Sequence, residues 1–293
     1  MYVITGITGK VGGALARFLL NDRQPVRAII RDASKGAVWA ALGCEVAIAN
    51  MDDAATLTDA FKGATGVFIL PPSDFDPEPG FPEARKVIAA VAQAIEAAAP
   101  QKVVCLSTIG AQAEHLNLLT QRTLMEQALS ALNVPVTFLR PGWFMENSAY
   151  DVLAAREHGV INSFLQPLDK AVPMIATADV GRLAAQLLQQ HWSGRRVVEL
   201  EGQWVSPNDI ARTLTEVLGR GVTAQVVPRD AWEPMFREQG AQNPMPRMRM
   251  IDGFNEGWIC FEQADVVKGE TTLLKVLREL AAKPDAMACK PAQ

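Results

Sequence analysis

Three glycines near the start of the chain have the spacing of a phosphate-binding turn. Gly6, Gly9 and Gly12 lie three residues apart in the segment TGITGKVGG, between an apolar run and a helical pattern. Glycine allows a tight turn and close approach to a pyrophosphate, and a helix N-terminus offers free N–H groups to that anion. The segment therefore predicts a dinucleotide-binding turn, with a plain strand–helix turn as the alternative. The expected cofactor contacts here are Gly6, Thr8, Gly9, Lys10, Val11 and Gly12.

Arg31 is the second residue whose type and position indicate chemistry. It ends the apolar segment VRAIIR, where such folds place the residue that faces the adenosine ribose. An acid there accepts a hydrogen bond from the 2′-hydroxyl of NAD, whereas an arginine can pair with the 2′-phosphate of NADP. Asp32 follows, but adjacent residues of a strand point to opposite sides. We therefore expect NADP(H), with a solvated surface arginine as the alternative.

The elements that must position these residues alternate regularly through the first half of the chain. Apolar runs rich in β-branched residues predict strands at 2–5, 26–31, 44–49, 66–71, 102–108 and 134–140. Helical periodicity between them predicts helices at 11–21, 33–42, 53–62, 81–99 and 116–132. Strictly alternating βα units imply the α/β class, with a doubly wound parallel sheet.

The second half of the chain is less regular. Asp179 predicts the cap of a helix at 180–190, and Ser206 before Pro207 starts another that stops at Gly219. Further strands are expected at 195–202 and 223–228. The expected organisation is a Rossmann domain at 1–150 to which 173–202 returns, a smaller and mostly helical cap built from insertions at 203–280, and a tail at 281–293 with little reason to be ordered.

Composition excludes several classes of function. The net charge of −4 gives no basic footprint, so direct nucleic-acid binding is not expected. The most apolar helix is interrupted by Gln93 and Glu96, so no membrane span is expected. The chain starts without a signal peptide, and its cysteines lack metal or redox spacing, which predicts reduced thiols in a cytoplasm and no metal site. These cysteines are Cys44, Cys105, Cys260 and Cys289.

Several segments together resemble a known family. TGITGKVG, VRAIIRD, NMDDAATLTDAFKG and LRPGWFMEN (139–147) are similar to the NmrA-like branch of the atypical short-chain dehydrogenases, a resemblance that runs from residue 2 to about residue 270. It implies a Rossmann-type NADP-binding domain and a smaller C-terminal cap. Members of the family range from redox-sensing regulators to quinone reductases and reductases of natural-product biosynthesis.

The resemblance also implies further contacts with the cofactor. Pro141 and Gly142 would lie beside the nicotinamide amide, and Pro71 and Pro72 would flank the cofactor. Asn50 stands where relatives often carry an aspartate near the adenine. The further cofactor contacts expected are Asn50, Met51, Pro71, Pro72, Ser107, Arg122, Pro141 and Gly142.

The segment HLNLLTQRTLME (115–126) departs from the wider superfamily. Short-chain dehydrogenases place here a tyrosine that gives a proton to the reduced oxygen, and a lysine four residues later that lowers the pKa of that tyrosine. Leu118 and Arg122 have this spacing, and the only tyrosines are Tyr2 and Tyr150. Arg122 can hold ribose hydroxyls, but an arginine stays protonated and cannot relay protons. The usual dyad is therefore absent.

Two functions remain open. Hydride from NADPH could pass directly to an apolar acceptor that needs no strong acid, such as a quinone or an iminium ion. Alternatively, the protein could be a catalytically silent redox sensor that acts through a protein partner. The residues that could replace the missing proton donor are His115, Tyr150 and Thr108. The alternative for each is an ordinary structural role, as a loop, surface or strand-end residue. The expected substrate pocket is Trp143, Phe144, Asn147, Met248 and Trp258, and these could equally form core.

Overall fold

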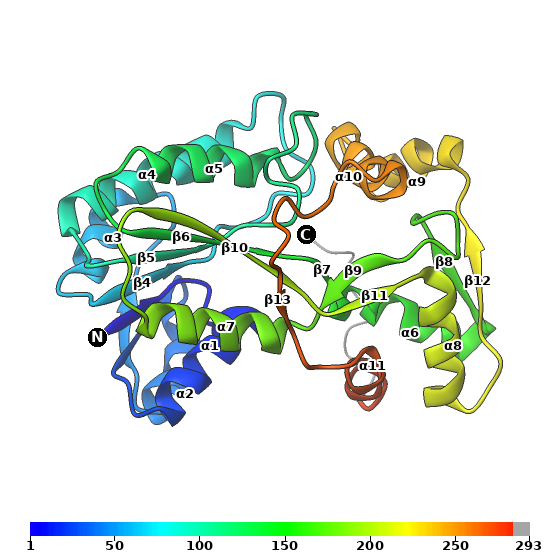
Figure 1. Cartoon of the computed structure of the whole chain (residues 1–293), viewed down its shortest axis with the longest axis horizontal. Helices are drawn as coiled ribbons and strands as arrows, with labels where there is room; N and C mark the ends of the chain where they lie inside the picture. The colour runs from blue at the N-terminus through cyan, green and yellow to red at the C-terminus, as the bar shows by residue number, and fades with distance from the viewer. Residues whose placement is uncertain (284–293) are drawn as a thin grey trace.

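The computed structural model describes residues 1–283. The chain forms a large sheet covered by helices and, beside it, a smaller cap (Figure 1). Most of the predicted tail, residues 284–293, lies outside the described residues.

The main sheet has eight strands in the order β13-β10-β6-β5-β4-β1-β2-β3, and every pair is parallel. Successive strands run outward from β1 to β3, and the chain then crosses back to β4, which creates a switch point between β1 and β4. This order confirms the predicted doubly wound α/β fold. The strands are β1 (Tyr2–Ile4), β2 (Val26–Ile30), β3 (Glu45–Ile48), β4 (Gly66–Ile69), β5 (Val103–Leu106), β6 (Val136–Pro141), β10 (Arg195–Glu201) and β13 (Val267–Lys268).

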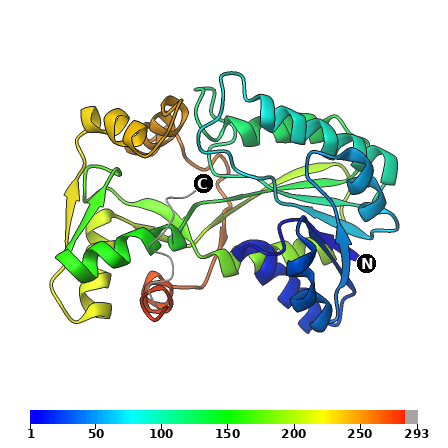
Figure 2. The same ribbon diagram turned by 180° about the vertical axis from the view of Figure 1, so that it is seen from behind.

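Helices cover both faces of this sheet, as Figures 1 and 2 show. One face carries α1 (Lys10–Asn21), α2 (Gly36–Ala41) and α7 (Thr177–Gln189), and the other carries α3 (Ala54–Phe61), α4 (Pro82–Ala98) and α5 (Thr120–Ser130). The central strands β4 and β5 are buried along their whole length, because helices pack on both sides of them.

The start of α7 differs from the prediction. The helix begins at Thr177, whose N–H donates to Glu146 Oε1 at 2.9 Å. Asp179 therefore lies inside the first turn and does not cap the helix. Its carboxylate instead accepts hydrogen bonds from the backbone N–H groups of Glu270 and Thr271, at 3.0 and 2.8 Å. The expectation for Asp179 was wrong because a residue distant in sequence satisfies the helix end.

The cap contains two small sheets as well as helices, and a core of its own. Its strands pair in the orders β11-β9-β7 and β12-β8. The expected helix from Ser206 to Gly219 is confirmed, with a capping box between Ser206 and Asp209. The cap elements are β7 (Trp143–Phe144), α6 (Ala149–His158), β8 (Val160–Ser163), β9 (Val172–Ile175), β11 (Gln203–Val205), α8 (Pro207–Leu218), β12 (Thr223–Val226), α9 (Trp232–Glu238), α10 (Met245–Glu256) and α11 (Leu273–Ala281).

The chain passes repeatedly between the two halves. Within 173–202, the elements α7 and β10 lie in the sheet half, whereas β9 lies in the cap. Within 203–280, the range expected for the cap, β13 returns to the edge of the main sheet and pairs with β10. Residues 143–163 also build cap elements, so the cap is assembled from several separate stretches of chain.

Candidate functional site

The glycine-rich turn connects β1 to α1 at the carboxyl edge of the sheet. Gly6 has a φ of +64°, in the left-handed region that favours glycine. A Cβ at Gly12 would lie 2.4 Å from the carbonyl oxygen of Gly6, so the helix starts directly against the turn. A Cβ at Gly9 would lie 3.3 Å from the same oxygen. The fold therefore demands glycine at positions 6 and 12 more strictly than at position 9.

The N-terminus of α1 is left open for an anion. Its N-cap residue, Gly9, has no side chain, and its first turn holds no acid. Three other helices begin with a side-chain cap, from Asp53, Ser206 or Thr272. The first N–H groups of a helix have no intrahelical partner, and they lie at the positive end of the helix dipole. This end of α1 thus has the features of a pyrophosphate site.

The other residues expected in this turn have different environments. Thr8 and Lys10 are exposed, whereas Val11 is buried in the core between α1 and the sheet. Only the backbone of Val11 is therefore available to a ligand. Burial lowers the pKa of Lys10, and the nearby charge of Glu146 opposes that shift. Lys10 therefore lies near Glu146, which belongs to the segment that leads from Gly142 into the cap.

Arg31 is exposed directly after β2, on the same edge of the sheet. Asp32 follows it and starts the next turn, where its Oδ1 accepts from Ser34 N at 2.9 Å and from Ser34 Oγ at 2.7 Å. Asn50 and Met51 follow the neighbouring strand β3, so parallel pairing brings them to the same edge. This grouping fits the adenosine end of an NADP site.

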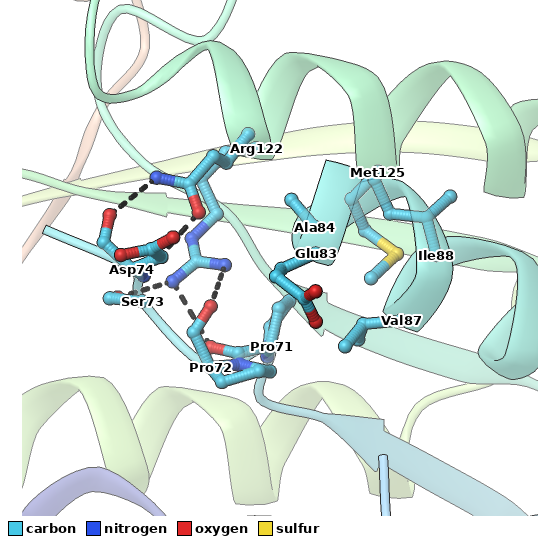
Figure 3. Close-up of a pocket in the computed structure, with 11 residues that line it drawn as sticks. Pro71, Pro72, Ser73, Asp74, Glu83, Ala84, Val87, Ile88, Arg122 and Met125 are labelled. Carbon is cyan, nitrogen blue, oxygen red and sulfur yellow. Dashed lines mark hydrogen bonds between the residues drawn. The ribbon is translucent and has the colours of Figure 1, made fainter. Parts of the chain in front are cut away.

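Arg122 holds the loop that follows β4. Its guanidinium donates to the carbonyl oxygens of Pro71 and Pro72, at 3.0 and 3.2 Å, and to Ser73 Oγ at 2.6 Å (Figure 3). Burial lowers the pKa of Arg122 to about 10, so the side chain stays charged at neutral pH. A guanidinium has five N–H donors, and these bonds use three of them. Arg122 thus positions Pro71 and Pro72 and keeps donors for a ligand.

A cavity of about 310 Å³ opens beside this loop, between α4 and α5. Figure 3 shows Arg122 at one side of it and the apolar side chains of α4 at the other. Gln121 closes the loop from α5, because its Nε2 donates to the carbonyl oxygen of Asp74 at 2.8 Å. The lining residues are Pro71, Pro72, Ser73, Asp74, Glu83, Ala84, Val87, Ile88, Gln121, Arg122 and Met125.

Leu118, the residue expected from the sequence to replace the superfamily's tyrosine, is buried beside the cap. Its side chain is 5% exposed, and its backbone N–H donates to the carbonyl oxygen of Pro246 in α10 at 2.8 Å. Tyr2 is buried in β1, and Tyr150 lies 55% exposed at the start of α6. Neither tyrosine lies in the 115–126 segment.

A buried ion pair lies under the end of β5. Arg140 binds Glu126 through two hydrogen bonds, at 2.9 and 2.7 Å, and Ser107 Oγ donates to Glu126 Oε1 at 2.5 Å. Burial opposes the charge of Arg140, but its hydrogen bonds to Glu126 and Glu262 outweigh this and raise its pKa. The hydroxyl of Ser107 therefore donates its hydrogen bond to Glu126. Sequence reasoning missed this pair, although the arginine in the apolar strand TFLRP was a visible signal.

His115 and Thr108 lie near the carboxyl edge of β5. His115 is exposed and stacks on Trp258, with ring centroids 4.9 Å apart. Thr108 is half-buried directly after Ser107. The structure brings His115 to the cap helix α10 and its following turn, but it gives the imidazole no hydrogen-bonding partner among residues 1–283.

The expected pocket walls divide into two groups. Trp143 is half-buried and meets Phe254 edge-on, with ring centroids 5.0 Å apart, and Phe144 beside it is also half-buried. Asn147 is exposed. Met248, by contrast, is 3% exposed and belongs to the cap core.

The turn before Trp143 packs tightly. Gly142 donates its N–H to Leu200 O at 2.9 Å, and a Cβ there would lie 2.5 Å from Pro173 O. Pro141 accepts a hydrogen bond from the N–H of Ile109 at 2.9 Å. Close packing against β9 therefore requires glycine at position 142 and fixes the path of the chain into β7.

Comparison with known proteins gives this arrangement a family. The NmrA-like family matches residues 2–257. The chain belongs to the NmrA-like family. Its curated relatives include quinone oxidoreductase 2 of Escherichia coli (strain K12), 29% identical over 77% of both proteins. The NAD(P)H azoreductase of Xenophilus azovorans is 29% identical, over 76% of this chain and 75% of the relative.

Solved structures agree with this assignment. The NADPH-dependent quinone oxidoreductase QOR2 of Escherichia coli, complexed with NADPH, has a TM-score of 0.81 and 25% identity, with 96% of this chain and 99% of that chain covered. The Citrobacter sp. triphenylmethane reductase complexed with NADP(H) has a TM-score of 0.79 and 21% identity, with 95% and 99% covered. The family resemblance read from the sequence is thus confirmed. Among residues 1–283, every helix is too short or too polar to cross a membrane.

Proposed function

We propose that the protein is an NADPH-dependent oxidoreductase that passes hydride directly to an apolar, electron-poor acceptor such as a quinone. The observation that carries this proposal is the combination of an open dinucleotide turn at α1 with Leu118 at the tyrosine position, bonded to Pro246 of the cap. Relatives with the names quinone oxidoreductase and azoreductase support the same reaction class.

The residues present fit NADP(H). Gly9 and the free end of α1 would hold the pyrophosphate, and the exposed Arg31 at the end of β2 would pair with the 2′-phosphate. Arg122 would bind the ribose hydroxyls through its remaining donors while it fixes Pro71 and Pro72. When bound, NADPH supplies the hydride. The chain contributes binding, orientation and a cover over the site.

The chemistry of the acceptor follows from the groups around Leu118. In this proposal neither Ser107, whose hydroxyl donates a hydrogen bond to Glu126, nor His115, whose ring lies against Trp258, serves as the proton donor. A ketone would become an alkoxide without a donor, which is costly in a site shielded from water. A quinone becomes a delocalised phenolate, which is far more stable. Trp143 and Phe144 would supply the apolar wall for such a ring.

A test of this proposal is the oxidation of NADPH, followed at its absorbance, with a panel of naphthoquinones and benzoquinones and with simple ketones as controls. We expect steady turnover with quinones only. Tight binding of NADPH without turnover of any acceptor would contradict the proposal and favour the alternative, a catalytically silent sensor of NADP(H) that acts through a protein partner.

A further inference from the structure

The cap contains one arginine in an unusual environment. Arg229 binds Asp252 through two hydrogen bonds, at 2.7 and 2.9 Å, and Arg249 approaches the same carboxylate at 3.5 Å. Arg237 pairs with Glu233 at 2.8 Å. Arg247 differs from these three, because within residues 1–283 its guanidinium has no carboxylate partner.

Arg247 lies against an aromatic ring, as Arg229 and Arg249 do, but without a carboxylate beside it in the described part of the chain. Its guanidinium stands over the ring of Phe236, 4.4 Å from the centroid. Burial lowers the pKa of Arg247. A partly desolvated cation without a counter-charge is energetically costly, and a bound anion would offset that cost.

The position of Arg247 on α10 directs it toward the expected substrate pocket. Phe254 lies seven residues later, which places it on the same face of the helix about two turns away. That face meets Trp143, which contacts Phe254 at 5.0 Å. On the other side, Pro246 is bonded to Leu118. Arg247 therefore lies on the helix that contacts Leu118 through Pro246 and the first residue of β7 through Phe254.

We infer that Arg247 binds an anionic substituent, a sulfonate or carboxylate, on the aromatic acceptor. The inference rests on the proposed function, because it concerns the substrate of the same site. Arg247 would repel a cationic acceptor, so the iminium ion considered from the sequence becomes the less suitable of the two acceptor classes. The acceptor class is thus an anionic aromatic ring system, with Phe236 holding the guanidinium in place.

Direct binding tests this without any need for turnover. Naphthalenesulfonate and its neutral analogue naphthalenesulfonamide are titrated by calorimetry into the full-length protein saturated with NADP⁺. A charge-assisted contact predicts about ten-fold or more tighter binding of the sulfonate. Arg247→Gln should remove this preference, and Arg247→Lys should keep part of it. Arg237→Gln is the matched control, because Arg237 is already paired with Glu233 at 2.8 Å, and it should retain the preference.

Each outcome has a clear meaning. Equal affinities of the unmutated protein for the two ligands, or binding of neither, would overturn the inference, as would an equal loss of preference in Arg247→Gln and Arg237→Gln. Turnover of neutral naphthoquinone is measured in parallel. Failure of that reaction alongside an Arg247-dependent preference would leave the anion site standing and reject the proposed function. Turnover of neutral naphthoquinone without an Arg247-dependent preference for the sulfonate would support the proposed function and reject the anion site.

Discussion

The backbone N–H of Leu118 and the carbonyl oxygen of Pro246 are 2.8 Å apart, and this bond joins the start of α5 to the cap helix α10. A second hydrogen bond lies two residues before α10, where the carboxylate of Asp76 accepts from the backbone N–H of Asn243 at 2.6 Å. The cap thus lies directly on the segment in which the superfamily has its proton donor, and the space for a larger side chain there is closed.

Reintroduction of the missing residue should therefore fail. Leu118→Tyr places a larger side chain in a closed, buried position, and overpacking of this kind costs about 1–3 kcal/mol. We expect a lower midpoint of urea unfolding and no gain of ketone reduction. Leu116→Tyr, at a side chain 61% exposed, is the control and should unfold like the unmutated protein. A stable Leu118→Tyr protein that reduces ketones would show that the site accommodates the dyad after all.

Cofactor choice is expected to depend on Arg31. If Arg31 pairs with the 2′-phosphate, NADPH should bind on the order of ten- to a hundred-fold more tightly than NADH, since a charge-assisted hydrogen bond contributes about 1.5–3 kcal/mol. Arg31→Ala should lose this preference and leave NADH binding almost unchanged. Arg23→Ala, in the loop between α1 and β2 at the opposite edge of the sheet, should behave normally. Equal affinities in the unmutated protein would exclude the assignment of Arg31.

The two glycines of the turn should respond differently to substitution. Gly9→Val adds bulk where only 3.3 Å separates a new Cβ from the Gly6 oxygen, and it covers the free end of α1. We expect a folded protein that binds neither cofactor, measured by circular dichroism and calorimetry. Gly12→Ala, with a Cβ at 2.4 Å from that oxygen, should destabilise the fold itself. Normal NADPH affinity in Gly9→Val would reduce the segment to a structural turn.

Direct hydride transfer without a general acid from the protein predicts a rate that hardly depends on pH. If hydride passes directly to the acceptor, kcat/KM for a neutral quinone should vary little between about pH 6 and 9. His115→Ala should change it less than about two-fold, since no relay is needed. Stopped-flow measurement across the range checks both statements. A sigmoidal profile that disappears in His115→Ala would show that the imidazole has become the donor.

Asp151 should make stability depend on pH. Burial in α6 raises the pKa of its carboxyl from 3.8 to about 7, although a hydrogen bond with Ser148 opposes the shift. Between these values the folded protein keeps a proton that the unfolded chain has released, so its free energy of unfolding falls as pH rises through this window and levels off above it. Asp151→Asn should flatten that part of the curve, as followed by urea unfolding from pH 4 to 8. The exposed Asp265→Asn should leave it unchanged.

The parts of this fold that follow from local pattern were predictable. The run GVFI of β4 and the glycine spacing after β1 identify a covered strand and a tight strand–helix turn without knowledge of their neighbours. Interactions between distant segments were not. The two residues of β13 are exposed and form a strand only because β10 lies beside them.

The same distinction holds within the site. The spacing of Leu118 and Arg122 led to the prediction that the dyad is absent. It did not indicate that Pro246 accepts a hydrogen bond from the former or that Pro71 and Pro72 accept hydrogen bonds from the latter. Likewise, nothing in the local sequence indicated that Arg140 would find Glu126 fourteen residues away along the chain. These contacts depend on how sheet, loop and cap are folded against one another.

The return of the chain to the sheet at β13 has a practical consequence for where this protein can be cut. The family match ends at residue 257, yet β13 and α11 follow it, and Leu277 of α11 is fully buried in the cap core. A gene fragment that stops at the family boundary would therefore lose the edge strand and open the cap core to water, although every residue expected to contact NADPH would still be encoded. The segment matched by the family, residues 2–257, is therefore shorter than the segment that forms the complete fold.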